Sequence, residues 1–388
     1  MRDSKCYPVP VPRVIHVITR LIAGGAQENT ILCCQALRDR YDVKLVTGPP
    51  EGLEGSLLED AARRGIATTV VPELVRPVRP GLDLAALRRL AWIFRAERPD
   101  IVHTHSSKAG ILGRAAAWEA DVPVVVHTNH GLPFHGGQPW PVRAAWWMLE
   151  KLAAGATDAV VCVGEEMKRQ SVRARLGRPD FFEVIRSGIE AAPFLEARGV
   201  RDRLGIAPDV PVLGVVSRMA RHKGHRFLVE AAPLGTHLLF VGDGEERGPL
   251  ERQARERGVR ATFVGHVAPA EVPDLIASMD VLVHPSLWEG LPRAAVQALL
   301  AGRPVVAFDR DGAREVVIDG VTGRLVPPGS TGALRSALED VLGRPDRGRS
   351  LGEEGRRRVL GAFDWREAGG RLDRLYRRLL ERRGIPVL

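Results

Sequence analysis

Short runs of apolar and β-branched residues recur along the chain, and longer segments with helical spacing of apolar residues separate them. Five such runs lie in the first half, at residues 13–18, 43–46, 101–104, 124–127 and 159–163. Five more follow, at residues 211–216, 238–241, 262–264, 281–283 and 304–307. Near-continuous apolar strands that alternate with helices are typical of a parallel sheet covered on both faces. The pattern predicts an α/β protein with two sheets in succession.

The two halves of the chain begin alike. Residues 14–31 and 213–229 each read as a strand, a turn and a helix, which indicates two similar lobes in tandem. Residues 187–200 between them carry Gly and Pro, as linkers do. We therefore expect an N-terminal domain at residues 1–190, a second domain at residues 200–365, and a ligand in the cleft between the two.

The last segment, residues 366–388, carries apolar residues at helical spacing among many arginines. The apolar positions are Leu372, Leu375, Tyr376, Leu379 and Leu380. This spacing predicts an amphipathic helix with a basic outer face. We expect it to cross back and cover the first domain; the alternative is a surface that also touches acidic lipid.

A second amphipathic segment follows residue 139. Val142, Trp146, Leu149 and Ala153 form an expected core stripe, while Arg143, Trp147 and Lys151 follow on another face. A tryptophan flanked by cations is also compatible with an anionic bilayer surface. The pattern predicts a packed helix, with membrane contact as the alternative.

Composition narrows the class of protein. The 388 residues are 45% hydrophobic and 27% charged, which suits two or three ordered domains. A net charge of +9 indicates an anionic partner: nucleic acid, an acidic membrane surface or a phosphate-bearing ligand. The four cysteines, Cys6, Cys33, Cys34 and Cys162, lack the spacing of a disulfide framework or a zinc ribbon. No export signal or membrane span is visible, so we expect a reducing, cytoplasmic location.

Glycines mark two strand-to-helix turns. Gly24 and Gly25 follow the first strand and precede a helix expected to begin near Asn29, where backbone N–H groups could approach an anion. The turn lacks the G-x-G-x-x-G pattern, which disfavours dinucleotide binding. A second turn, Gly242 to Gly248, has the wrong spacing for that pattern and two acidic residues, so we expect a solvated turn.

Candidate chemistry gathers in the second half. Arg218 and Lys223 come directly after the first strand of the second lobe, at the end where open α/β sheets bind ligands. A guanidinium fork and an ammonium together suit a diphosphate. The alternative is a solvated basic loop.

Another loop, Glu289-Gly290-Leu291-Pro292, follows a later strand and leads into a helix that carries Gln297. A carboxylate repels phosphate but accepts hydrogen bonds from hydroxyl groups, so Glu289 suits the recognition of a sugar.

Together these residues, the Gly24-Gly25 turn and the segment 312–326 resemble family 4 of the retaining nucleotide-sugar glycosyltransferases. The resemblance extends from about Val14 to Trp365. It implies the GT-B fold, in which two Rossmann-like domains face each other across a cleft. It also implies that the second domain binds the donor, that the first binds the acceptor, and that no metal or other cofactor takes part.

The resemblance also assigns roles. It implies that Arg218 and Lys223 neutralise the donor diphosphate and that Glu289 contacts the sugar hydroxyls beside the anomeric carbon. Backbone amides of Gly290 and Leu291, before Pro292, would meet phosphate or sugar oxygens. Two further contacts are implied: the loop containing His266 and Val267 would hold the nucleobase, and His130 of the first domain would lie close to the donor sugar and the acceptor.

The chain departs from the family at one position. Members usually carry a second glutamate that binds the ribose hydroxyls where this chain has Gln297. An amide oxygen still accepts a hydrogen bond, but only as a neutral partner. We therefore expect weaker nucleotide binding or an altered choice of donor.

Histidines and a strand end in the first domain allow further hypotheses. The histidines at 103, 105, 127, 130 and 135 could form a zinc site, but no supporting cysteine is present and we expect no metal.

An acceptor-phosphate site is expected where a strand meets a helix, at His105, Ser106, Ser107 and Lys108, with a simple helix cap as the alternative.

The sequence thus predicts transfer of a sugar from a nucleotide sugar, preferably a UDP-sugar, to a glycan or lipid-linked acceptor, with peripheral contact to the inner face of the cytoplasmic membrane as an option. A nucleotide-sugar epimerase of the same fold is one alternative. A basic nucleic-acid-binding protein is the other, but aromatic residues make up only 5% of the chain and provide few surfaces on which bases could stack, so we expect no nucleic acid.

Overall fold

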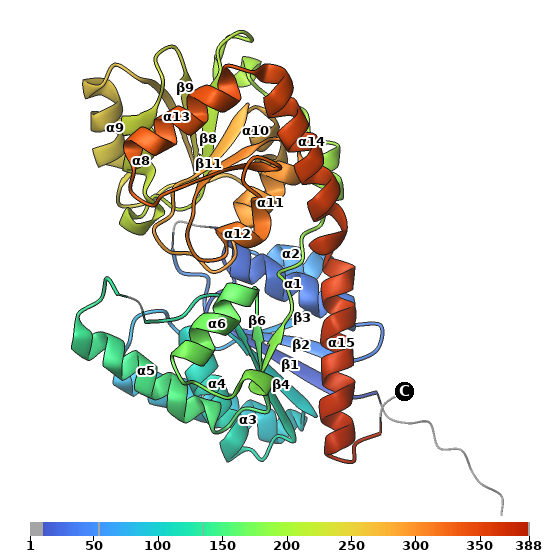
Figure 1. Ribbon diagram of the computed structural model, residues 1–388. Coiled ribbons are helices and arrows are strands. Elements are labelled where there is room, and N and C mark those ends of the chain that lie inside the picture. Colours follow the sequence, from blue (N-terminus) through green and yellow to red (C-terminus); the bar gives the residue numbers. More distant parts are fainter. Residues whose placement is uncertain (1–10, 53–54, 135, 387–388) are drawn as a thin grey trace, which may run out of the picture.

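The computed structural model describes residues 11–52, 55–134 and 136–386 and shows two α/β lobes joined to a pair of long C-terminal helices (Figure 1). Cys6 and His135 lie outside the described residues. Each lobe is built around one sheet in which all neighbouring strands are parallel. The fold is therefore the predicted pair of Rossmann-like lobes.

The first lobe holds a seven-stranded sheet in the order β3-β2-β1-β4-β5-β6-β7. Its strands are β1 (Arg13–Ile18), β2 (Asp42–Thr47), β3 (Ala67–Val70), β4 (Ile101–His105), β5 (Val124–Asn129), β6 (Ala159–Cys162) and β7 (Phe182–Val184). Its α-helices are α1 (Gly25–Leu37), α2 (Leu58–Arg63), α3 (Pro80–Glu97), α4 (Ser107–Glu119), α5 (Trp140–Ala154) and α6 (Glu165–Arg173).

The second lobe holds a six-stranded sheet in the order β10-β9-β8-β11-β12-β13. Its strands are β8 (Val212–Val216), β9 (His237–Val241), β10 (Arg260–Gly265), β11 (Val281–His284), β12 (Val305–Phe308) and β13 (Gly323–Val326). Its α-helices are α7 (Ala192–Leu195), α8 (His225–Ala231), α9 (Arg247–Glu256), α10 (Val272–Ala277), α11 (Arg293–Leu300), α12 (Ala313–Val316), α13 (Thr331–Leu342) and α14 (Pro345–Ala362). Short 3₁₀ turns are η1 (Pro179–Phe181), η2 (Asp202–Leu204), η3 (Arg221–Lys223) and η4 (Pro269–Glu271).

All ten predicted strands are present, and three further strands were not predicted. These are β3, β7 and β13, and each lies at an edge of its sheet. Edge strands are short and partly exposed, so they need no continuous apolar run. β3, for example, has no fully buried residue. The apolar pattern therefore finds all the central strands but, of the four edge strands, only β10.

The strand order reverses once in each sheet, next to the first strand. In the first sheet β1 lies between β2 and β4, and in the second sheet β8 lies between β9 and β11. Successive connections leave in opposite directions at such a point, which opens a crevice at the carboxyl ends of the two central strands. The loops after β1 and β4, and those after β8 and β11, therefore meet at these crevices.

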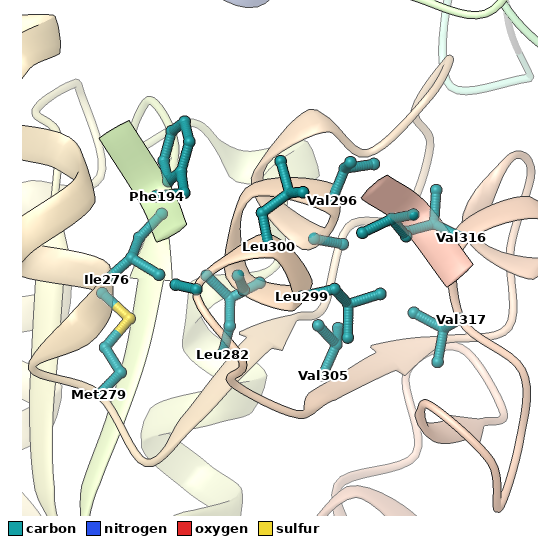
Figure 2. Packing of buried hydrophobic residues seen from close by; sticks show 14 of the residues in the cluster. Phe194, Ile276, Met279, Leu282, Val296, Leu299, Leu300, Val305, Val316 and Val317 are labelled. Atoms are coloured by element: carbon teal, nitrogen blue, oxygen red, sulfur yellow. The ribbon is translucent and has the colours of Figure 1, made fainter. Parts of the chain in front are cut away.

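The core of the second lobe fixes the loop after β11. Figure 2 shows Val296, Leu299 and Leu300 of α11 between Phe194 and Ile276 on one side and Val316 and Val317 on the other. All of these side chains are buried. Because α11 is packed on both sides, the loop that precedes it and carries Glu289 is anchored at its C-terminal end.

The C-terminal helix α15 (Trp365–Arg382) crosses back to the first lobe, as predicted, and packs along α1 (Figure 1). Its five predicted apolar residues are buried in the first-lobe core. Close approach requires a small residue, because a Cβ at Gly369 would lie 2.3 Å from the Cβ of Ala36. The apolar face of α15 is thus used inside the protein and is not available to lipid.

Helix α5 departs from its predicted packing. Val142 and Leu149, expected in the core, are exposed, with 45% and 42% of their surfaces accessible. Trp147, expected on the other face, packs beside β6 and donates its indole N–H to the carbonyl of Ala174 at 2.8 Å. The predicted core stripe is therefore wrong, because α5 contacts the lobe through a different face and leaves apolar residues in solvent.

Candidate active site

A cavity of about 1010 Å³ lies between the lobes at the carboxyl ends of both sheets. Ten of the predicted site residues line it: Gly24, Gly25, His130, Arg218, Lys223, His266, Val267, Glu289, Leu291 and Gln297. Gly290 and Pro292 lie in the same loop as Glu289 but are not among the lining residues. Side chains from loops far apart in the sequence therefore face one space.

Lys223 and Glu289 meet where the strand order of the second sheet reverses. Lys223 closes the turn η3 after β8, and Glu289 lies in the loop after β11. Gly224 has φ +68°, and a Cβ there would lie 2.1 Å from the carbonyl oxygen of Pro285, so only glycine lets the two loops approach this closely. The Lys223 ammonium forms an ion pair with Oε2 of Glu289 at the cavity wall.

The environment of Glu289 keeps its carboxylate charged. Burial raises the pKa of Glu289, but Lys223 and the adjacent His284 lower it by a larger amount. The pKa of Glu289 therefore lies below its ordinary value. Nε2 of His284 lies 3.7 Å from Oε2 of Glu289, and burial lowers the pKa of this histidine to about 4. At neutral pH the pair is therefore a carboxylate beside a neutral imidazole.

Arg218 adds a positive charge that no neighbouring group neutralises. It lines the cavity, and within the described part of the chain its guanidinium has neither a hydrogen bond nor an ion pair. Burial, Lys223 and Arg218 together lower the pKa of the nearby His222 to about 4, which makes that histidine neutral. Since Glu289 offsets Lys223, Arg218 leaves this wall with a net positive charge suited to an anion.

The loop with Glu289 also contacts the first lobe, which sequence reasoning missed. The backbone N–H of Glu289 donates to Asp311 at 2.9 Å, and Asp311 in turn accepts from Gln170 of α6 at 2.9 Å. A Cβ at Gly290 would lie 2.1 Å from the carbonyl oxygen of His130. Gly290 is therefore required by a close contact between the lobes.

Glu315 makes a second contact between the lobes. Its carboxylate accepts from the backbone N–H groups of Glu165 and Glu166, both at 2.9 Å, and so caps the N-terminus of α6. The residue belongs to the segment 312–326 that carried the resemblance, but nothing in the sequence pairs it with α6. Its role was visible only in three dimensions.

The Gly24-Gly25 turn differs from its prediction in one respect. Helix α1 begins at Gly25, four residues before the expected start at Asn29. A Cβ at Gly25 would lie 2.6 Å from Cδ of Arg293, whose guanidinium donates to the carbonyl of Gly188 at 2.7 Å and to Glu28 at 3.1 Å. Gly25 therefore leaves room for an arginine of the second lobe.

The residues of the predicted acceptor-phosphate site lie away from the cavity. His105 is fully buried, and neither it nor Ser106, Ser107 or Lys108 lines the cavity. Lys108 forms a largely buried ion pair with Asp83, and Oγ of Ser106 bonds Oγ1 of Thr19 at 2.7 Å. The side chains of His105, Ser106 and Lys108 therefore already have partners within the first lobe.

The turn that begins at Gly242 also differs from its prediction. Gly242 and Asp243 line the cavity, and a Cβ at Gly242 would lie 2.2 Å from the carbonyl oxygen of Ser217. The turn packs against the loop after β8 at the cleft, so it is only partly exposed to solvent. Gly242 has φ +125°, which favours glycine, so the glycine directly after the strand was the signal in the sequence.

The fold and this cavity define a two-lobed α/β protein with a positively charged ligand site at the meeting of its sheets. The profile of the family Glycosyl transferases group 1 matches residues 198–358, and that of Glycosyltransferase Family 4 matches residues 23–192. The glycogen synthase of Mycobacterium tuberculosis (strain ATCC 25618 / H37Rv) is 31% identical over 302 residues, covering 74% of this chain and 70% of the relative. The chain belongs to the family 4 glycosyltransferases and has the GT-B fold.

One further relative and two solved structures are also similar to this chain. The UDP-Gal:alpha-D-GlcNAc-diphosphoundecaprenol alpha-1,3-galactosyltransferase of Escherichia coli is 28% identical over 343 residues, covering 85% of this chain and 87% of the relative. The crystal structure of Anabaena Alr3699/HepE with UDP and glucose superposes with a TM-score of 0.80 at 21% identity, covering 94% of this chain and 99% of that one. WaaG, a glycosyltransferase involved in lipopolysaccharide biosynthesis, gives 0.75 at 17% identity, with coverage of 94% and 99%. The likeness to both structures concerns the fold.

Proposed function

We propose that this glycosyltransferase moves a sugar from a nucleoside diphosphate sugar, preferably a UDP-sugar, to a hydroxyl group of a glycan or lipid-linked acceptor, with retention of configuration and without a metal ion. The observation that carries the proposal is the paired placement of Lys223 and Arg218 on the wall that also holds Glu289. The names of the Escherichia coli relative and of the HepE complex support a uridine nucleotide.

The chemistry follows from this placement. As the bond between the anomeric carbon and the diphosphate lengthens, negative charge accumulates on the leaving group, and two fixed cations stabilise it without reorganisation of solvent. The acceptor hydroxyl attacks from the same face, its oxygen bonds the anomeric carbon, and its proton passes to the departing phosphate. Glu289 orients the sugar through its hydroxyl groups.

A donor screen tests this proposal. Thermal unfolding is measured with UDP-, GDP-, ADP- and dTDP-sugars, and the nucleotide that raises Tm is expected to be the donor, because ligands that bind only the native state stabilise it. Products with a glycan or lipid-linked acceptor are then identified by mass spectrometry. A new glycoside supports transfer. An epimerised donor would identify an epimerase, and salt-dependent binding of DNA or RNA without any nucleotide-sugar binding would identify a nucleic-acid-binding protein.

Gln297 supplies a prediction about the nucleotide. It lies on α11 and lines the cavity, and its side-chain amide has no hydrogen-bond partner among the described residues. We expect Gln297→Glu to change the KM for the donor more than kcat, because a carboxylate binds ribose hydroxyls more strongly than an amide. Steady-state kinetics with varied donor measure both constants. Complete loss of activity would contradict a role in ribose binding.

We also propose that α5 rests on an anionic membrane surface at the cytoplasmic side, where a lipid-linked acceptor would be reached. Several large apolar side chains of the helix are exposed: Trp140, Val142, Met148, Leu149 and Leu152. The only acidic residue of α5, Glu150, is buried in an ion pair with Arg114 at 2.7 Å, so the cations Arg143 and Lys151 are unopposed on the exposed side. An apolar face bordered by cations fits an acidic bilayer. Among the described residues, every helix is too short or too polar to span one.

Replacing Leu149 and Leu152 with aspartate is expected to abolish binding to vesicles that contain anionic phospholipid, because the change adds negative charge to the apolar face. Co-sedimentation with such vesicles measures binding, and neutral vesicles serve as the reference. The variant Leu234→Asp, at an exposed leucine of the second lobe, is the matched control. Equal binding by both variants would show that α5 is not the docking surface.

A further inference from the structure

Two buried histidines and one partly exposed histidine of the first lobe form a chain that ends in the cavity. They are His16 in β1, His105 at the end of β4 and His130 directly after β5. Nδ1 of His16 lies 2.9 Å from Nε2 of His105, and Nδ1 of His105 lies 3.2 Å from Nε2 of His130. The three rings are therefore linked by two hydrogen bonds in series.

The rings lie edge to edge. The planes of His16 and His105 differ by 16° with centroids 5.2 Å apart, and those of His105 and His130 differ by 30° with centroids 5.5 Å apart. Each centroid separation is close to its largest possible value, the N···N distance plus the two ring radii, so each bond lies close to the planes of both rings. This is favourable geometry for N–H···N bonds.

The same contacts argue against a metal centre. His16, His103 and His105 each offer a ring nitrogen, and these atoms lie within 4.8 Å of one another. However, His103 uses both nitrogens, bonding the hydroxyl of Tyr376 at 2.6 Å and Oγ1 of Thr128 at 2.7 Å. Both nitrogens of His105 are occupied within the chain. The lone pairs that a metal would need are thus directed at other partners.

The two ends of the chain differ. Nε2 of His16 is buried and has no hydrogen-bond partner among the described residues. Nδ1 of His130 also makes no hydrogen bond within them, but it is not a buried atom, and His130 lines the cavity. One end of the chain is therefore closed, and the other faces the substrate site.

All three imidazoles are neutral near pH 7. Burial lowers the pKa of His16 to about 3, and burial together with the charge of Arg293 lowers the pKa of His130 to about 3. Burial and the neighbouring histidines hold the pKa of His105 well below its ordinary value. A neutral imidazole has one donor and one acceptor nitrogen, so both hydrogen bonds must point in the same direction.

The buried Nε2 atom of His16 determines the direction of both hydrogen bonds. If the protons lay on the Nε2 atoms, His16 would bury an N–H group without an acceptor, and unpaired buried donors are rarer than unpaired acceptors. If they lie on the Nδ1 atoms, His16 donates to His105, His105 donates to His130, and only a lone pair is unpaired. His130 then presents an N–H group to the cavity.

We infer that His16 and His105 are positioning residues that hold His130 as an Nδ1–H donor toward an oxygen atom of the bound substrate. The substrate's identity rests on the proposed function, whereas the protonation of the chain does not. The sequence analysis placed His105 among the residues that bind the acceptor. In the structure His105 hydrogen-bonds to His130, and it is His130 that lines the cavity.

Nuclear magnetic resonance of the full-length protein with ¹⁵N-labelled histidine tests the tautomer without any substitution. We expect the His130 proton on Nδ1, and a loss of this preference in His105→Phe. A proton on Nε2 of His130 in the unmodified protein would overturn the inference. Because this measurement needs no turnover, it remains decisive even if no nucleotide sugar proves to be a substrate.

A double-mutant cycle tests the effect on turnover. His105→Phe is expected to lower kcat about 10- to 100-fold, as misplacement of a reacting group does. In a His130→Ala background the same change should lower it no more than about twofold, because His105 acts only through His130. His105→Asn, which retains a donor near Nδ1, is expected to restore part of the activity. If His105→Phe lowered kcat as much in the His130→Ala background as in the unmodified enzyme, the inference would be contradicted.

The matched control is His127→Asn. His127 is similarly buried on β5, and its Nδ1 bonds Oγ1 of Thr104 at 2.9 Å, outside the chain. Its substitution is expected to leave the tautomer of His130 unchanged. A shift of the His130 tautomer in this variant would mean that packing, and not the hydrogen-bonded chain, determines it.

Discussion

Replacing Lys223 with alanine is expected to lower kcat by about 100- to 1000-fold, the usual cost of removing one fixed group that stabilises charge in the transition state. The ammonium lies beside Glu289 on the cavity wall and is positioned by the turn η3 and by Gly224. The variant also leaves the Glu289 carboxylate without its cation next to the diphosphate, which adds repulsion. Turnover with the donor found in the thermal screen measures the effect.

The control for this prediction lies on the same turn. Arg221 is exposed and does not line the cavity, although it is also a cation two residues away. Arg221→Ala should therefore retain nearly all of the activity. Addition of EDTA to the unmodified enzyme should have no effect if the cations replace a metal. A Lys223→Ala enzyme that turns over at the normal rate, or one that depends strictly on a metal, would refute the assignment.

Glu289→Gln is expected to lower kcat by about 100-fold while the KM for the donor stays constant or falls. The amide cannot hold the sugar hydroxyls as strongly as a carboxylate, so the reacting carbon is less well placed. At the same time a negative charge disappears beside the diphosphate, and Lys223 keeps its full charge for the phosphates. A fall in kcat without a rise in KM distinguishes this variant from a simple loss of binding, which would raise KM.

The pH dependence offers a second check on Glu289. Its pKa is depressed in the folded protein, so the ion pair with Lys223 stabilises the fold above the ordinary pKa of a glutamate, and this contribution is lost as pH falls through the depressed value. The carboxylate is thus fully charged from pH 6 to 8, and no titration of Glu289 should appear in kcat there. The matched control for Glu289→Gln is Glu245→Gln, because Glu245 is an exposed glutamate that does not line the cavity.

Sequence patterns located much of the site because its residues occur where strands end. Lys223 and Glu289 are 66 positions apart, yet each follows a central strand of one parallel sheet, and such strands have their carboxyl ends at one edge. The same reasoning also selected Ser106 and Lys108, which do not line the cavity. A strand end next to a helix is common to many α/β loops, and only packing shows that their side chains are already bonded to Thr19 and Asp83.

The sequence by itself determined the central strands, the two lobes, the crossing helix and the residue types at the cleft, because burial imposes apolar periodicity and turns require particular residues. Only the tertiary structure decided which lobe surfaces touch. Glu315 capping α6, Gly290 against His130, and the histidine chain each join residues from separate elements, and such contacts depend on distances between packed elements that no local pattern encodes. The exposed apolar face of α5 has the same origin, since helical spacing shows that a stripe exists but not which side of the helix meets the core.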